Sequence, residues 1–339
     1  MGEQAHMKAA NPEVAVGSRF ASARRSVAAP TVSIGVPVYN GARFLAASLE
    51  SLVGQSYENI EIVISDNGST DETEQIARNF AARDARVRYV RHDTNRGAAF
   101  NFSSLVREAS GLYFKWAAHD DLVAPTLVER CVQVLEGSSE RVCLAYPRTH
   151  IIDENGDFVR AYDDNLDLRD EAPHDRLRRL VRNIVMSNAI FGLIRRSTLE
   201  RTRLLESFPS SDYVLLAELA LLGEFWEIPE PLFFRREHAA MSRQANRTGA
   251  EVAEWFEPGS GKDEAGREKL VREFWRLFGE HLRSINSAPL TYSERVRCDV
   301  VFVREWLWRF GARMLSELFR REYNGSWNPF RRSATAEET

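Results

Sequence analysis

Two adjacent carboxylates give this sequence its clearest chemical signal. Asp120 and Asp121 follow His119 directly after an apolar run, Gly111-Leu-Tyr-Phe-Lys-Trp-Ala-Ala. Neighbouring carboxylates repel each other unless a cation lies between or beside them. A hard divalent cation such as Mg²⁺ or Mn²⁺ does this, and it commonly bridges carboxylates to the phosphates of a substrate. The alternative is a helix N-terminus, where aspartates stabilise the first turn.

Three more polar segments follow short apolar runs earlier in the chain. They read Pro37-Val-Tyr-Asn-Gly, Asp66-Asn-Gly-Ser-Thr-Asp and His92-Asp-Thr-Asn-Arg-Gly. None of them contains a G-x-G-x-x-G or a G-x-x-x-x-G-K-[S/T] sequence, so the sequence supports neither a dinucleotide site of that kind nor a P-loop.

The elements that must position these residues alternate between strands and helices. Apolar strands are predicted at about 31–38, 59–66, 87–91 and 111–118, and helices at about 42–53, 70–83 and 98–109. A further helix opens at Pro125, where the missing N–H costs nothing. This alternation predicts a doubly wound, mostly parallel α/β sheet with helices on both faces. Ligands bind such sheets beyond the carboxyl ends of the strands, where all four polar segments lie.

The order of these four segments, PVYNG, SDNGSTD, NRG and HDD, resembles that of the family 2 glycosyltransferases, which have the GT-A fold. The resemblance covers about residues 31–242. It implies a nucleotide-diphosphate sugar as the donor and a divalent metal, Mn²⁺ or Mg²⁺, as the cofactor. It also implies that Asp121 is a metal ligand and that Asp120 faces the nucleotide-sugar. The other residues that it implies in nucleotide-sugar binding in these segments are Pro37, Tyr39, Asn40, Asp66, Asn67, Ser69, Asn95, Arg96 and Gly97.

A later helix, which begins at Ser211-Asp212, resembles the acceptor-side helix of the same family. The resemblance implies that Asp212 is the general base. An inverting transfer needs a carboxylate that takes the proton of the acceptor hydroxyl as this hydroxyl attacks the anomeric carbon. An alternative is that Asp212 and Ser211 cap their helix, and Glu218 on the same helix is a second candidate for the base.

The segment 228–242 resembles the part of these enzymes that closes the site. His238 would complete the metal shell or contact the diphosphate. Arg235 and Arg236 would supply cations for the leaving group, because a guanidinium binds phosphate oxygens bidentately. The alternatives are a surface histidine and arginines that pair with the nearby residues Glu227, Glu230 or Glu237.

Composition and charge exclude several other classes of protein. The chain has 339 residues and 45 Lys and Arg against 49 Asp and Glu, a net charge of −4, which argues against a basic nucleic-acid-binding protein. Its three cysteines form no C-x-x-C pair, so we expect neither a disulfide framework nor a zinc site. No apolar run is long enough for a transmembrane helix, and the N-terminus lacks the apolar core of a signal peptide. We therefore expect a cytoplasmic protein.

The composition and the hydropathy pattern divide the chain into five parts. We expect a flexible tail at 1–29, a GT-A domain at 30–245 (nucleotide-binding half 30–122, acceptor half 123–245), a linker at 246–263, a helical region at 264–325 and a tail at 326–339. Residues 267–332 carry 14 Lys and Arg against 8 Asp and Glu, mixed with Trp and Phe. Such helices either pack on the catalytic domain or on a second copy in a homodimer, or attach peripherally to the inner, anionic face of a membrane.

Other functions remain as alternatives to a transferase acting on a saccharide, a lipid-linked precursor or a small molecule. A non-catalytic nucleotide- or carbohydrate-binding module with the same fold would bind nucleotide without turnover. The presence of all four segments together with both Asp120 and Asp121 favours the transferase. A sugar-nucleotide pyrophosphorylase is disfavoured, since the segment after the first strand, Pro37-Val-Tyr-Asn, is not rich in glycine.

Overall fold

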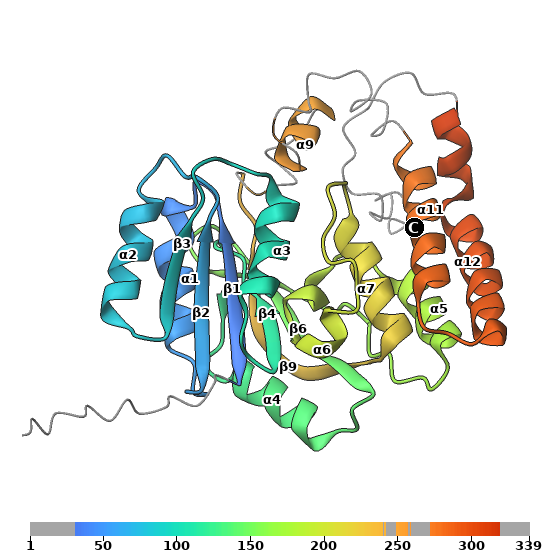
Figure 1. Cartoon of the computed structure of the whole chain (residues 1–339), viewed down its shortest axis with the longest axis horizontal. Coiled ribbons are helices and arrows are strands. Elements are labelled where there is room, and N and C mark those ends of the chain that lie inside the picture. Colours follow the sequence, from blue (N-terminus) through green and yellow to red (C-terminus); the bar gives the residue numbers. More distant parts are fainter. Residues whose placement is uncertain (1–30, 240, 242–248, 257, 259–271, 319–339) are drawn as a thin grey trace, which may run out of the picture.

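The structure, a computed structural model, describes residues 31–239, 241, 249–256, 258 and 272–318 (Figure 1). The expected tails at 1–29 and 326–339 lie outside the described residues.

The nucleotide-binding half contains the predicted alternation of strands and helices. Its elements are β1 (Val32–Val38), α1 (Ala42–Val53), β2 (Ile60–Asp66), α2 (Thr73–Arg83), β3 (Val87–Arg91), α3 (Ala98–Glu108) and β4 (Tyr113–Trp116). The four strands are parallel, in the order β3-β2-β1-β4. All seven residues of β1 are buried, which is typical of a central parallel strand covered on both faces. The predicted fold class is confirmed here.

The expected acceptor half continues the same sheet. Its strands are β5 (Leu122–Val123), β6 (Val142–Ile152), β7 (Phe158–Tyr162), β8 (Leu193–Arg195) and β9 (Glu224–Arg236), and its helices are α4 (Leu127–Gly137), α5 (Pro173–Asn183), α6 (Arg196–Leu199) and α7 (Ser211–Leu222). The sheet order runs on from β4 as β8-β6-β9-β5, with β7 beside β6. The β6–β9 pair is parallel, whereas β5, β7 and β8 run antiparallel to their neighbours.

The turn at Asp120-Asp121 leads into the short strand β5 and not into a helix. The alternative that these aspartates begin a helix is therefore wrong. β5 forms because Leu122 and Val123 pair with Phe234 and Phe233 of β9, so that the backbone after the carboxylates is held in the sheet.

Helices cover both faces of the sheet with two apolar cores. One core contains residues of α1, α2 and α4, such as Leu49, Phe80 and Leu135. The other contains residues of α3, α5 and α7 and of the C-terminal helices. Trp116 lies in this second core with no exposed surface, as expected for a packing residue.

Three further helices follow β9. They are α9 (Gly249–Phe256), α11 (Glu273–Ser287) and α12 (Tyr292–Leu318). α9 lies within the stretch that we expected to be a linker, and it contacts α3. α11 packs on α7, and α12 packs on α5 and α11. α11 and α12 thus cover the acceptor half, at the opposite end of the molecule from α1 and α2 (Figure 1).

Candidate functional site

The loops after β1 and β2 are joined through Asn40 and Ser69. Asn40 has a left-handed backbone (φ 51°), and its backbone N–H donates to Ser69 Oγ at 2.9 Å. The Asn40 side chain accepts from the N–H of Thr70 at 2.8 Å. Asparagine tolerates this backbone region because its short polar side chain forms such local hydrogen bonds. Nearby, Tyr39 is exposed and Pro37 is buried within β1.

Asp66 at the end of β2 is fully buried, and protein groups hold both of its carboxylate oxygens. Oδ1 accepts from the N–H of Ser69 at 2.8 Å, and Oδ2 accepts from the Tyr89 hydroxyl at 2.7 Å and from Arg91 at 3.2 Å. Burial, and then the hydrogen bond to Asp66, raise the pKa of Tyr89 to about 12. Asp66 therefore organises this loop. Its contact with a base or ribose stays a prediction, which requires one of these partners to move.

Asn67 connects the second loop to the third. Its Nδ2 donates to Asn95 Oδ1 at 2.7 Å, and its Oδ1 accepts from the N–H of Arg96 at 3.0 Å. Gly97 has φ +84°, and a Cβ at this position would lie 2.1 Å from the carbonyl oxygen of Phe256 in α9. Only glycine suits both this backbone and this close approach. The structure thus gathers the first three predicted segments at the carboxyl edge of the sheet, which we call the donor edge.

Asp120 and Asp121 have different partners, both near the end of β9. Asp120 Oδ2 lies 3.0 Å from His238 Nε2, and Asp121 Oδ1 accepts from the N–H of Arg236 at 2.8 Å. Gly41, in the first loop, lies directly against His119, since a Cβ on Gly41 would lie 2.5 Å from the His119 ring. The carboxylate pair therefore lies at the donor edge, as predicted.

The two carboxylates have opposite electrostatic environments. Burial alone would raise the pKa of Asp120, but the hydrogen bond with His238 and the charges of His119 and His238 hold this pKa well below its usual range. Burial and the Asp120 charge raise the pKa of Asp121, against the smaller effects of Arg235 and Lys115. A divalent cation beside Asp121 would favour the charged form of this carboxyl.

The residues present fit a cation that is shared with a substrate. The described ranges gather no group of three or more His, Cys, Asp or Glu side chains that could hold a metal alone. Two carboxylates do suit Mg²⁺ or Mn²⁺, because these ions usually keep water and take substrate phosphates as further ligands. The buried His238 Nδ1 has no hydrogen-bond partner among the described residues. His238 directly contacts Asp120, and its role as a metal ligand stays a prediction.

Arg236 holds the carboxylate turn in place. It is buried, and its guanidinium donates to the backbone carbonyls of Asp120, Asp153 and Glu154 at 2.8–3.1 Å. It also lies over the ring of Phe44 at 4.9 Å. These partners occupy the guanidinium, so its predicted contact with a leaving diphosphate would require it to leave them.

Arg235 is the arginine that faces other candidate residues. Its Nη1 donates to Asn188 Oδ1 at 2.5 Å, and its charge acts on the carboxyls of both Asp121 and Asp164. The predicted alternative, in which Arg235 and Arg236 pair with nearby glutamates, is not seen among the described residues, because Arg148, Arg130 and Arg160 pair with Glu227, Glu230 and Glu237.

Asp164 is a candidate residue outside the motifs that predict the site. It is 4% exposed, and neither carboxylate oxygen has a hydrogen bond of ordinary geometry within the described structure. Burial raises its pKa to about 7, although Asn188 and Arg235 act in the opposite direction. A buried carboxyl without a firm partner indicates a place for a polar ligand. Its only sequence signal, the acidic cluster Asp163-Asp164-Asn165, is also common in surface turns.

Asp212 lies in the first turn of α7 and accepts a hydrogen bond from Ser187 Oγ. The residue before this helix is Ser210, which has a left-handed backbone (φ 63°), and no side chain caps the helix. The alternative that Asp212 and Ser211 cap the helix is therefore wrong. The carboxylate bonds instead to the segment before the 3₁₀ turn at Asn188–Phe191, because α7 begins beside that segment.

A continuous chain of contacts connects the donor edge with Asp212. Asp121 accepts from the N–H of Arg236, the neighbouring Arg235 donates to Asn188, and Ser187, which precedes Asn188, donates to Asp212. The structure thus brings together the predicted metal carboxylate, an arginine and the predicted base, although they are far apart in the sequence.

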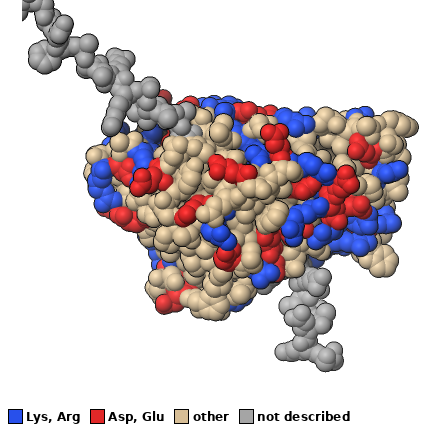
Figure 2. Space-filling view, turned by 90° about the horizontal axis from the view of Figure 1, so that it is seen from below, with Lys and Arg blue, Asp and Glu red and all other residues tan. Residues whose placement is uncertain are grey.

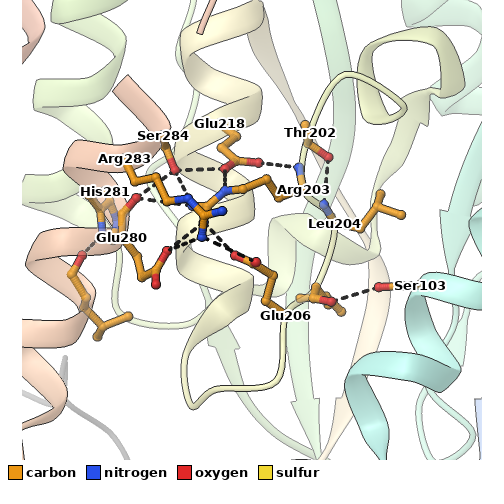
Figure 3. A network of polar contacts seen from close by, with 12 residues as sticks. Ser103, Thr202, Arg203, Leu204, Glu206, Glu218, Glu280, His281, Arg283 and Ser284 are labelled. Atoms are coloured by element: carbon orange, nitrogen blue, oxygen red, sulfur yellow. Dashed lines mark hydrogen bonds and ion pairs between the residues drawn. The ribbon is translucent and has the colours of Figure 1, made fainter. Parts of the chain in front are cut away.

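Glu218 belongs to a different, structural network. Its carboxylate accepts from Arg203 Nε at 2.6 Å and from Ser284 Oγ at 2.8 Å. Arg203 also pairs with Glu206 and Glu280, so that α7, the loop before it and α11 are bonded together (Figure 3). Both Glu218 oxygens are engaged, since the second accepts from the N–H of Arg203 at 2.8 Å. A carboxylate held in this way does not suit a general base.

Comparison with known proteins identifies the family. A model of glycosyl transferase family 2 matches residues 33–202, which is half of the chain. The chain is a family 2 glycosyltransferase. Among curated relatives of this family 2 glycosyltransferase, an uncharacterized glycosyltransferase of Rickettsia bellii is 35% identical over 132 residues, 38% of this chain and 19% of the relative. The putative glycosyltransferase EpsE of Bacillus subtilis is 37% identical over 108 residues (32% and 39%), and chondroitin synthase of Escherichia coli is 31% identical over 130 residues (38% and 19%). The matches therefore span less than half of each relative.

Solved structures support the GT-A fold of this family 2 glycosyltransferase. TarS of Staphylococcus aureus, solved with UDP-GlcNAc, has a TM-score of 0.60 at 14% identity, over 82% of this chain and 72% of that one. The mannosyltransferase PcManGT of Pyrobaculum calidifontis, solved with GDP-Man and Mn²⁺, has a TM-score of 0.50 at 16% identity, over 87% and 76%. At these identities the likeness establishes the fold alone.

Proposed function

We propose that this family 2 glycosyltransferase moves a sugar from a nucleotide-diphosphate sugar to an acceptor hydroxyl in one displacement, with inversion and with a divalent cation. The observation that carries the proposal is the series of hydrogen bonds from Asp121 to the N–H of Arg236, from the adjacent Arg235 to Asn188, and from the adjacent Ser187 to Asp212. It connects a carboxylate suited to a metal–diphosphate complex with a separate carboxylate suited to a base.

On the donor side, the joined loops carrying Asn40, Ser69 and Asn95 form the platform for the nucleoside. Asp120 and Asp121 would hold Mn²⁺ or Mg²⁺, and the metal would neutralise the diphosphate as it leaves. Arg235 adds a fixed positive charge on the same side, which costs no reorganisation during the reaction. The nucleotide-sugars bound by TarS and PcManGT, UDP-GlcNAc and GDP-Man, support this class of donor.

On the acceptor side, Asp212 takes the proton of the attacking hydroxyl. Ser187 donates to one of its oxygens, Oδ2, and thereby fixes the direction of the carboxylate. Among the described residues no hydrogen bond reaches Oδ1, which leaves this oxygen for the acceptor. Because the base acts on an incoming hydroxyl and forms no bond to the sugar, the product has the inverted configuration at the anomeric carbon.

The test begins with donor binding. Thermal unfolding is measured with UDP, GDP, dTDP and CDP sugars, each with Mn²⁺ and with EDTA. A saturating donor, at about 100 times its Kd, stabilises the folded state by about 2.7 kcal/mol. We expect stabilisation by one nucleotide class, and only with the metal. Stabilisation that is equal with EDTA would refute the metal dependence.

The second step separates catalysis from binding with a variant of the base. The responding donor is incubated with saccharide, lipid-linked and small-molecule acceptors, and the anomeric configuration of the product is read by NMR. Asp212→Asn is expected to lower turnover by about 10²–10⁴-fold and to leave donor stabilisation unchanged. Donor binding without turnover by the unmodified chain would support the non-catalytic module instead. A product of retained configuration would exclude the single displacement.

A further inference from the structure

The solvent face of α12 carries large apolar side chains along its whole length. Trp308 is 89% exposed and Val300 is 62% exposed, although large apolar side chains are costly to leave in water. The opposite face is also apolar, since Phe302, Trp306 and Phe310 are buried there beside α5 and α11. An exposed patch of large apolar side chains marks an interaction site. The exposed apolar side chains of this face are Tyr292, Val296, Val300, Leu307, Trp308, Leu315 and Leu318.

The charged side chains on this face are all positive. Arg297 and Arg304 are exposed, whereas the acidic residues of α12 are buried or half-buried. Glu305 is buried and is shared by Arg182 and Arg304, so a positive charge remains in excess there. Figure 2 shows basic side chains, which are all arginines in α11 and α12, gathered at the end of the molecule formed by these helices, with some acidic ones beside them.

We propose that this face of α12 binds an anionic lipid surface, a property beyond the transfer reaction itself. Helices with exposed Trp and Leu side chains next to arginines lie in the plane of the lipid headgroups, where the apolar side chains enter the acyl boundary and the cations meet phosphate. The charges argue against a second copy of this chain as the occupant. A symmetric pairing of this face would bring Arg297 and Arg304 close to arginines of the second copy, with only the partly exposed Glu294 and Asp299 of α12 to neutralise them.

The attachment is peripheral and lies along the helix. No helix in the described ranges is long and apolar enough to cross a membrane. With 27 residues, α12 is about 40 Å long and presents its apolar side chains from end to end. Its last turns point to the same end of the molecule as α9, which contacts Gly97 of the donor edge (Figure 1). A membrane along α12 therefore extends toward the catalytic end of the molecule.

The experiment is co-sedimentation of the full chain with vesicles. One set consists of phosphatidylcholine alone, and the other contains phosphatidylglycerol as an anionic component. We expect binding to the anionic vesicles that weakens in high salt. Arg297→Gln should weaken it about five-fold, the worth of one cation near an anionic surface. The double variant Trp308→Ser/Leu315→Ser should weaken it about ten-fold or more, because it removes two exposed apolar side chains that the lipid would bury.

The matched control is Phe158→Ser in β7, which removes a large apolar side chain that is 61% exposed elsewhere on the molecule. It should leave vesicle binding unchanged. Equal binding by the control and the double variant would overturn the proposal, as would no binding to anionic vesicles. Dimerisation of the chain without vesicles, abolished by the double variant, would assign the face to a second copy. Donor-induced thermal stabilisation should be the same in all variants, so this test is independent of the transferase proposal.

Discussion

Replacing Arg203 by methionine tests whether the C-terminal helices are bonded to the acceptor half through a buried charge. The Arg203 side chain is 19% exposed and lies within 2.6–2.7 Å of the carboxylates of Glu206, Glu218 and Glu280. It is the cation shared by all three. Arg203→Met therefore leaves the Glu218 carboxylate, which is 9% exposed, without a counter-charge. Removing one partner of a buried pair in this way costs about 3–5 kcal/mol of stability.

An ion pair on the surface provides the reference for this loss of stability. Arg78 and Glu74 are an i,i+4 pair at 2.8 Å, but the arginine side chain is 60% exposed. Arg78→Met is expected to cost only about 0.3–0.5 kcal/mol. Both variants are measured by urea unfolding of the full chain, followed by tryptophan fluorescence and far-ultraviolet circular dichroism. The free energy of unfolding is taken from the midpoint and the slope.

If Arg203→Met lowers the free energy of unfolding by less than about 1 kcal/mol, the value of an exposed ion pair, Arg203 does not act as a buried counter-charge. A second variant checks the cause. Adding Glu218→Gln to Arg203→Met removes the uncompensated charge, so the double variant should be more stable than Arg203→Met alone. If the double variant is less stable still, the loss arises from packing and not from charge.

Three further predictions concern single buried positions. Gly97→Ala should destabilise the chain by about 1–3 kcal/mol, because the residue has φ +84° and a Cβ would lie 2.1 Å from the Phe256 carbonyl oxygen. It should also weaken the stabilisation by the donor in thermal unfolding. An unchanged unfolding temperature with and without the donor would contradict this prediction. Burial lowers the pKa of Lys115 to about 8, so the unfolded chain binds more protons than the folded one between pH 8 and 10.5. The free energy of unfolding of the wild type, relative to that of Lys115→Met, should therefore rise over this pH range in urea unfolding. Burial raises the pKa of Asp164 from 3.8 to about 7, so the folded chain binds more protons than the unfolded one between these values, and stability falls as the pH rises through them. Asp164→Asn should therefore stabilise the unliganded chain at pH 8 but not at pH 4, while lowering kcat/KM. Equal stabilisation at both pH values would exclude the charge as the cause.

The sequence allowed the nucleotide-binding half to be predicted because its signals are local. Each strand from β1 to β4 is a short apolar run that ends in polar residues, and parallel pairing places Val38 opposite Asp66 without further information. The positions of Asp66, Asn67 and Asp121 at one edge follow from this pattern.

The partners of these residues could not be predicted in the same way. Arg236 looks like a ligand-binding arginine in the sequence, yet it is buried against backbone carbonyls, and Glu218 looks like a base yet holds Arg203. Which arginine meets which carboxylate depends on how β9 and α11 pack, and no local pattern encodes this. Asp164 was missed for the same reason, since its burial arises from the long-range arrangement of the sheet.

The distance along the chain between the carboxylates and their partners has a consequence for how the enzyme is made. The contacts of Asp121 with Arg236 and of Asp120 with His238 join residues 115 and 118 positions apart. At about 5–20 residues per second, a ribosome needs roughly 6–24 s to cover that interval. During this time β1 to β4 can already pair, whereas the two aspartates repel each other with neither the histidine nor the arginine in place. A nascent chain that ends before β9 would thus present the proposed nucleoside loops without the contacts that form the proposed metal site, and catalytic competence would arise in a late, separate folding step.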